Sequence, residues 1–81
     1  METALDKLKS AFAESIALPP GTAYDDVAYG KTNGWDSVAH MALISRIEEQ
    51  FDIMLETDDV IDLSSFPRAR EIVSRYGIAF E

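Results

Sequence analysis

Three side chains that can do chemistry stand close together near the middle of the chain, Asp36, Ser37 and His40. An acid, a serine and a histidine are the parts of a hydrolase triad, in which the histidine takes the serine proton and the acid orients the imidazole. A triad needs these groups to converge from separate elements, but here all three lie at the start of one helical segment. We therefore reject a triad, predict no catalytic residue, and expect His40 to be partly buried with its ring nitrogens bonded to the adjacent loop.

Acidic side chains dominate the segment from residue 52 to residue 62, which raises the question of a metal site. A calcium-binding loop places oxygen ligands at alternate positions around a central glycine. The stretch DIMLETDDVIDL instead has Ile53, Met54 and Leu55 where the ligands and the glycine should be. The chain has no cysteine and a single histidine. We therefore predict no metal centre.

Ser37 keeps two interpretations. Asp and Ser are both common at helix starts, so either Asp36 or Ser37 could cap the helix that follows. Alternatively, Ser37 is an attachment point, because a phosphate at this place would meet free N–H groups and the positive end of the helix dipole. Val38 and Met41 favour attachment, since both are apolar yet point away from the expected core, as residues of a docking surface do.

Hydrophobic spacing defines the elements of the first two thirds of the chain. Residues 3–17 form an amphipathic helix, which the LPPG stretch at 18–21 should end. The loop from 22 to 35 is long for so small a chain, and four of its residues should pack onto the helices: Tyr24, Val27, Tyr29 and Trp35. A second helix spans 37–51, and its core stripe is formed by Leu43, Ile44, Ile47 and Phe51, with His40 on the same side.

The last third contains a short and a longer helix. Residues 56–63 form one or two helical turns, which Thr57 can cap. Residues 64–77 form the last helix, which is capped by serine and closed by Gly77, and its buried stripe is formed by Phe66, Ala69, Ile72, Val73 and Tyr76. No segment alternates with a period of two. The predicted fold class is all-α, a small bundle of three main helices plus one short helix, in a single domain covering residues 1–81.

The charge of the chain is unevenly placed. The net charge is −8, and residues 36–62 contribute −7 because eight acids there face one arginine. Such a field repels nucleic acid and anionic membranes and attracts basic protein surfaces. No window approaches about 18 consecutive apolar residues, so we predict no membrane span, and the N-terminus lacks the apolar run of a signal peptide. We expect a monomer in the cytoplasm.

The stretch GWDSVAHMALISRIEEQFDI resembles the signature of acyl carrier proteins and of the related peptidyl carrier domains. In that family an Asp-Ser-Leu triplet opens the second helix, and its serine carries 4'-phosphopantetheine. Asp36-Ser37-Val38 is similar to that triplet, with valine in place of leucine. The later run IEEQFDIML…TDDVIDLSSFPRAREIV resembles the rest of the family, and the resemblance covers essentially the whole chain.

The resemblance implies a non-catalytic acyl carrier protein with a role for each matching residue. Ser37 would carry the 4'-phosphopantetheine arm, and Asp36 would assist the phosphopantetheinyl transferase that installs it, by contributing to its magnesium site. Four residues would contact partner enzymes: Val38 and Met41 as apolar groups, Glu48 and Glu49 as acids that meet basic patches. The partners would be an acyl-loading ligase and acyl-transferring or condensing enzymes. A core lined by Leu43, Ile47 and Ile61 would open to admit part of the cargo.

Some positions depart from the carriers of general fatty-acid synthesis. Ala42, Ser45 and Arg46 stand where acids or apolar contacts are common in that family, and the YGKTNGW loop looks more like stand-alone carriers of specialised pathways. We therefore expect a dedicated lipid or secondary-metabolite pathway and a short, hydroxylated or aminoacyl cargo. Two alternatives remain open: an aminoacyl or peptidyl carrier of a non-ribosomal-peptide-type pathway, and an unmodified acidic interaction domain in which Ser37 is only a cap.

Overall fold

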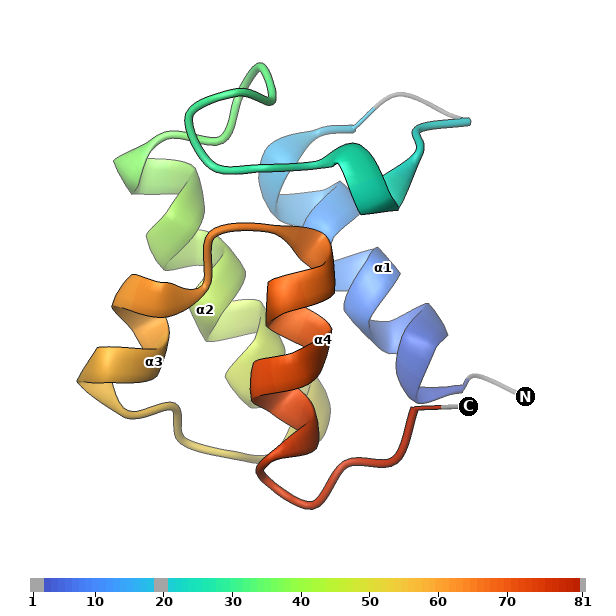
Figure 1. Cartoon of the computed structure of the whole chain (residues 1–81), viewed down its shortest axis with the longest axis vertical. Coiled ribbons are helices and arrows are strands. Elements are labelled where there is room, and N and C mark those ends of the chain that lie inside the picture. The colour runs from blue at the N-terminus through green and yellow to red at the C-terminus, as the bar shows by residue number, and fades with distance from the viewer. Residues whose placement is uncertain (1–2, 19–20, 81) are drawn as a thin grey trace.

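The computed structural model describes residues 3–18 and 21–80. It contains, in chain order, helix α1 (Ala4–Ile16), the 3-10 turn η1 (Tyr24–Asp26), helix α2 (Ser37–Phe51), the short helix α3 (Thr57–Asp62) and helix α4 (Phe66–Ser74). In Figure 1, α4 stands in front of α1, α3 lies at the outer side of α2, and the loop between α1 and α2 crosses one end of the bundle. The predicted all-α bundle of three main helices and one short helix is confirmed.

The first helix begins and ends with local hydrogen bonds. The Thr3 hydroxyl accepts from the Asp6 N–H at 3.1 Å, and the Asp6 carboxylate accepts from the Thr3 N–H at 3.3 Å, which forms a capping box. Ala17 closes the helix in the left-handed conformation, with φ of 57°. The helix thus ends at Ile16, ahead of the LPPG stretch that was expected to end it, and Pro19 and Pro20 of that stretch lie outside the described residues.

The hydrophobic core lies among α1, α2, α4 and the loop that precedes α2. Phe12 of α1 is fully buried and meets the Trp35 ring edge-on at 5.4 Å and the Phe66 ring at 4.9 Å. The predicted stripes of the second and last helices are buried as expected, except that Phe51 and Tyr76 are only half-buried. The buried residues are Leu8, Ala11, Phe12, Ile16, Val27, Trp35, Leu43, Ile44, Ile47, Leu63, Phe66, Ala69, Ile72 and Val73.

The long loop packs onto the helices, as predicted. Val27 is buried, and its carbonyl oxygen accepts a hydrogen bond from the Phe66 N–H at 3.1 Å. Two residues further, the Tyr29 N–H donates to the Ser64 carbonyl oxygen at 2.8 Å. The loop is therefore tied to the segment between α3 and α4, which brings Tyr29 to the start of α2.

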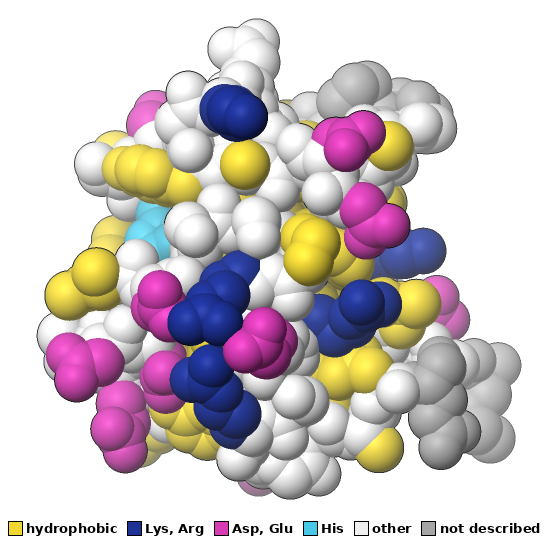
Figure 2. Space-filling model, in the orientation of Figure 1, with side chains coloured by type: hydrophobic (Ala, Val, Ile, Leu, Met, Phe, Trp, Pro, Cys, Tyr) yellow, Lys and Arg dark blue, Asp and Glu magenta, His cyan; other side chains and the backbone are white. Residues whose placement is uncertain are grey.

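The short helix α3 is attached by polar contacts and by Val60, which packs partly buried against the core. The helix contributes no fully buried residue. Asp59 accepts a hydrogen bond from the Tyr76 hydroxyl and lies 3.5 Å from the Arg75 guanidinium, and Asp62 pairs with Arg68. Figure 2 shows these basic and acidic side chains together over α3 and α4. Asp62 raises the pKa of the Arg68 guanidinium by its hydrogen bond.

Of the two helix caps predicted for α3 and α4, one is wrong and one is confirmed. The expectation that Thr57 caps α3 is wrong, because Thr57 is already the first helical residue and Glu56 takes the cap position without a side-chain hydrogen bond. The predicted serine cap of α4 is confirmed, since the Ser65 hydroxyl accepts from the Arg68 N–H at 3.1 Å. Gly77 has φ of 90°, the left-handed conformation expected of it, three residues beyond the end of α4 at Ser74.

Candidate functional site

At the start of α2, the capping residue and the candidate serine are two different residues. Asp36 is the cap residue, and its Oδ1 atom accepts a hydrogen bond from the Ala39 N–H at 2.9 Å. Ser37 is the first residue of the helix, and it is exposed. The sequence left the cap open between these two residues. The structure assigns it to Asp36, so that the Ser37 hydroxyl is not needed to begin the helix.

Ser37 stands among donors that would suit a negative group. The first N–H groups of a helix have no partner within the helix, and the Asp36 cap satisfies that of Ala39. This leaves the N–H groups of Ser37 and Val38 at the positive end of a 15-residue helix. The Tyr29 hydroxyl lies 3.3 Å from the Ser37 Oγ atom.

Near Ser37, the rings of Trp35 and His40 stack and are joined by a hydrogen bond. The Trp35 indole N–H donates to His40 Nδ1 at 3.1 Å, so Nδ1 acts as an acceptor and the proton of the neutral ring is on Nε2. Nε2 in turn donates to the Val60 carbonyl oxygen at 2.8 Å. The expectation that the ring nitrogens of His40 bond to the adjacent loop is confirmed for Nδ1 and wrong for Nε2, whose partner lies on α3. With both nitrogens engaged, His40 offers no base to Ser37.

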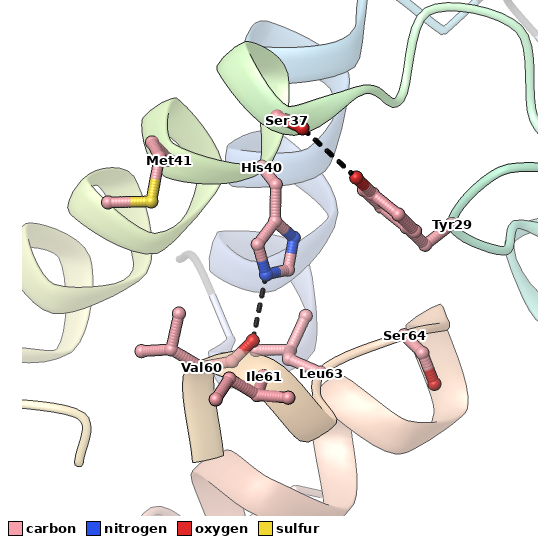
Figure 3. Close-up of a pocket in the computed structure, with 8 residues that line it drawn as sticks. All are labelled: Tyr29, Ser37, His40, Met41, Val60, Ile61, Leu63 and Ser64. Carbon is pink, nitrogen blue, oxygen red and sulfur yellow. Dashed lines mark hydrogen bonds between the residues drawn. The ribbon is translucent and has the colours of Figure 1, made fainter. Parts of the chain in front are cut away.

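A cavity of about 370 Å³ opens beside Ser37, between α2, α3 and the loop. Figure 3 shows His40 of α2 pointing to Val60 of α3, and Ser37 pointing to Tyr29, which reaches in from the loop. Leu43 and Ile47, which were expected to line a core that opens for the cargo, are fully buried and do not line this cavity, so that expectation stays a prediction. Ile61, the third expected residue, does line the cavity. Its lining is Tyr29, Ser37, His40, Met41, Val60, Ile61, Leu63 and Ser64.

Apolar side chains are exposed around the cavity. Val38 is 80% exposed and Met41 60% exposed, so both point away from the core, as the sequence predicted. Ile61 is 75% exposed at the cavity, while Met54, which is 84% exposed, lies in the segment between α2 and α3 and does not line the cavity. Figure 2 shows hydrophobic side chains on either side of the histidine, over α2 and α3. Sequence reasoning missed Met54, because the segment between α2 and α3 has no periodicity that would assign it a face.

The two predicted acidic contacts lie in different environments. Glu49 is exposed on α2. Glu48 is half-buried, and its Oε2 atom accepts a hydrogen bond from the Leu55 N–H at 2.9 Å, so it also orders the chain between α2 and α3. Sequence reasoning gave both residues one role, since their spacing on the helix carries no sign of the bond to Leu55.

The described ranges contain neither a metal-binding cluster nor a membrane-spanning helix. Among residues 3–18 and 21–80, no three His, Asp or Glu side chains converge to hold a metal ion. No described helix has both the length and the apolar character needed to cross a membrane. The acidic segment 52–62 is instead engaged with arginines and with Tyr76 where it has partners.

Comparison of the chain with protein-family models, with curated proteins and with solved structures gives no significant match. The geometry around Ser37 is therefore the main basis for a functional conclusion.

Proposed function

We propose that this chain is a carrier protein that holds an acyl or aminoacyl group as a thioester on a 4'-phosphopantetheine arm attached to Ser37. One observation carries the proposal. Ser37 presents an exposed hydroxyl on the first residue of α2, Asp36 relieves it of the capping role, and an apolar cavity opens beside it. This combination is unusual for a serine whose purpose is to start a helix.

The residues around Ser37 fit a phosphodiester. The N–H groups of Ser37 and Val38 and the helix dipole favour a negative group at this point. The Asp36 cap uses Oδ1 only, so the second carboxylate oxygen is available to the magnesium site of a phosphopantetheinyl transferase.

The chain has no cysteine, so the thiol that carries the cargo would come from the arm. The chain's own residues position and shield that cargo. Met41, Val60, Ile61 and Leu63 give the cavity an apolar lining, which excludes water from a bound acyl chain. The cavity volume lies near the lower end of the range for small-molecule pockets, roughly 300 to 1,000 Å³, and this favours a short cargo.

The partners we propose are enzymes that recognise the face around Ser37: the transferase, an acyl-loading ligase, and acyl-transferring or condensing enzymes. Exposed Val38 and Met41 provide apolar contacts, and exposed Glu49 provides a charge for a basic patch. The charge of −7 over residues 36–62 steers such partners to this face. The pathway we propose is a dedicated one in the cytoplasm, with the chain acting as a monomer.

The test is to incubate the protein with a phosphopantetheinyl transferase and coenzyme A and to measure its intact mass. We expect one phosphopantetheine mass on the wild type and none on Ser37→Ala. Ser64→Ala is the matched control, because Ser64 lines the same cavity and should leave the modification intact. An unchanged wild-type mass overturns the carrier function, and modification of Ser37→Ala overturns the site.

The same exposed face supports one other function, an acidic interaction domain that is never modified. Val38, Met41 and Ile61 are exposed whether or not Ser37 carries an arm. In that case the mass stays unchanged, while Met41→Ala weakens binding of a basic partner and Ser37→Ala does not. Isothermal titration with a basic peptide would measure this difference.

A further inference from the structure

Among the described residues that line the cavity, the Tyr29 hydroxyl is the one polar side-chain group placed to serve a ligand on Ser37. Both ring nitrogens of His40 are bonded, to Trp35 and to Val60. The Ser64 hydroxyl points away from Ser37 in Figure 3. The Tyr29 hydroxyl instead points at Ser37, and no other described group bonds to it.

The position of this hydroxyl is fixed by the rest of the residue. The Tyr29 ring meets the Trp35 ring edge-on at 5.9 Å and the His40 ring at 5.5 Å. Its backbone N–H donates to Ser64 at 2.8 Å. A side chain held at both ends loses little conformational entropy when it binds.

The contact with the unmodified serine is a poor hydrogen bond. The two oxygens are 3.3 Å apart, whereas hydroxyl–hydroxyl bonds cluster near 2.7 to 2.8 Å. A phosphate oxygen on Ser37 is a charged acceptor, and such acceptors form shorter and stronger bonds than a neutral hydroxyl. The tyrosine is thus in place before its best acceptor arrives.

We propose that the Tyr29 hydroxyl donates a hydrogen bond to the phosphate group carried by Ser37 and so fixes the direction in which the arm leaves α2, along the cavity mouth. This inference rests on the proposed function. Tyr29 is a positioning residue, since it touches the phosphate of the arm and not the cargo.

The first experiment compares Tyr29→Phe with wild type in the modified form, with Tyr24→Phe as the matched control. Tyr24 lies on the same loop but packs against Phe66, away from Ser37. We expect the phosphorus-31 resonance of the Ser37 phosphodiester to move in Tyr29→Phe and to stay in place in Tyr24→Phe. We also expect modification to raise the thermal midpoint less in Tyr29→Phe than in wild type. Coincident resonances and equal midpoint shifts would overturn the proposal.

A second experiment uses the wild-type chain alone, so that it holds even where the variant is modified poorly. With tyrosine labelled at Cζ, the Tyr29 carbon resonance should shift when the arm is attached, while that of Tyr24 should not. An unmoved Tyr29 resonance in a protein of confirmed increased mass overturns the role of Tyr29 and leaves the carrier function standing. A wild-type mass that never increases overturns both.

Discussion

The two sides of α2 are held to the rest of the molecule by different forces. Toward α1 and α4, α2 buries Leu43, Ile44 and Ile47 in a core centred on Phe12. Toward α3 it meets a helix with no fully buried residue, in which Val60 packs partly buried against the core and its carbonyl oxygen accepts from His40. The ion pairs of α3 join it to α4 and the end of α4. Polar surface contacts exchange with water at small net cost, while apolar burial does not. The α3 side, which contains the cavity, is therefore the side that can rearrange around a ligand without unfolding the bundle.

A core truncation should give the largest loss of stability, and it tests whether the two sides of α2 differ. Phe12→Ala should cost about 3–5 kcal/mol, because it removes a fully buried ring and leaves a cavity. A chain of 81 residues has a free energy of unfolding of about 4–12 kcal/mol, so this variant should be largely unfolded or close to it. Ile61→Ala is the matched change on the α3 side and should cost within about 0.5 kcal/mol. Urea unfolding measures both, and similar costs would disprove the contrast.

A smaller loss of stability should distinguish the alanine variants of Asp36 and Ser37. Asp36→Ala should lower the free energy of unfolding by about 1 kcal/mol, because the Ala39 N–H loses its acceptor. Ser37→Ala should change it by no more than about 0.5 kcal/mol, since Ser37 is exposed and, among the described residues, its hydroxyl is bonded only to Tyr29, at 3.3 Å. Thermal unfolding followed by circular dichroism measures both. A larger loss in Ser37→Ala than in Asp36→Ala would show that Ser37 has a structural role.

The sequence predicted the core side of α2 better than the α3 side, and the reason is physical. Leu43, Ile44 and Ile47 repeat with the period of a helix, so their burial is visible as a pattern. Helix α3 has six residues, too few for a period, and most of the contacts that attach it join residues 16 to 20 positions apart. Such long-range polar contacts leave no local signal.

The candidate site was predicted in the same uneven way. Asp36, Ser37, Val38 and Met41 are close in sequence and on one helix, so their exposure follows from helical geometry. Tyr29 reaches Ser37 only because its loop is tied to Ser64, a contact that no spacing reveals. The choice between Asp36 and Ser37 as the cap is decided only by the hydrogen bond from the Ala39 N–H in the folded chain, since both residue types are common at helix starts.

Charge reversal on α2 tests which side partners approach. Glu49→Lys should slow association with a basic partner enzyme by roughly two- to tenfold at low salt, and the difference should shrink as salt screens the charges. The rate of modification by the transferase at two ionic strengths measures this. Glu48→Lys should show the same slowing together with reduced stability, because the Leu55 N–H loses its acceptor. Glu48→Gln keeps an acceptor oxygen and separates the two effects. If the rates of modification at low salt are unchanged, Glu48 and Glu49 do not belong to the surface that contacts partners.

The smallest effect concerns the attachment of α3 at alkaline pH. The Tyr76 hydroxyl donates to Asp59 and accepts from the Glu56 N–H at 3.0 Å, and the bond to Asp59 raises the pKa of Tyr76 above its ordinary value of 10.0. Because the folded pKa exceeds the unfolded one, the stabilisation is complete below pH 10.0 and is lost as the pH rises through the raised pKa. Tyrosinate absorbance and urea unfolding across this range measure the titration and the loss.

Tyr76→Phe is the variant that isolates this bond. It removes the titrating hydroxyl, so its free energy of unfolding should fall less steeply with pH above 10.0 than that of the wild type. The loss at neutral pH should be small, because Arg75 still pairs with the Asp59 carboxylate when the Tyr76 hydroxyl is removed. Equal alkaline slopes in the two proteins would contradict the role of Tyr76. A loss at neutral pH as large as that of Phe12→Ala would show that polar contacts hold α3 as strongly as the core holds α1, and the two sides of α2 would then not differ in kind.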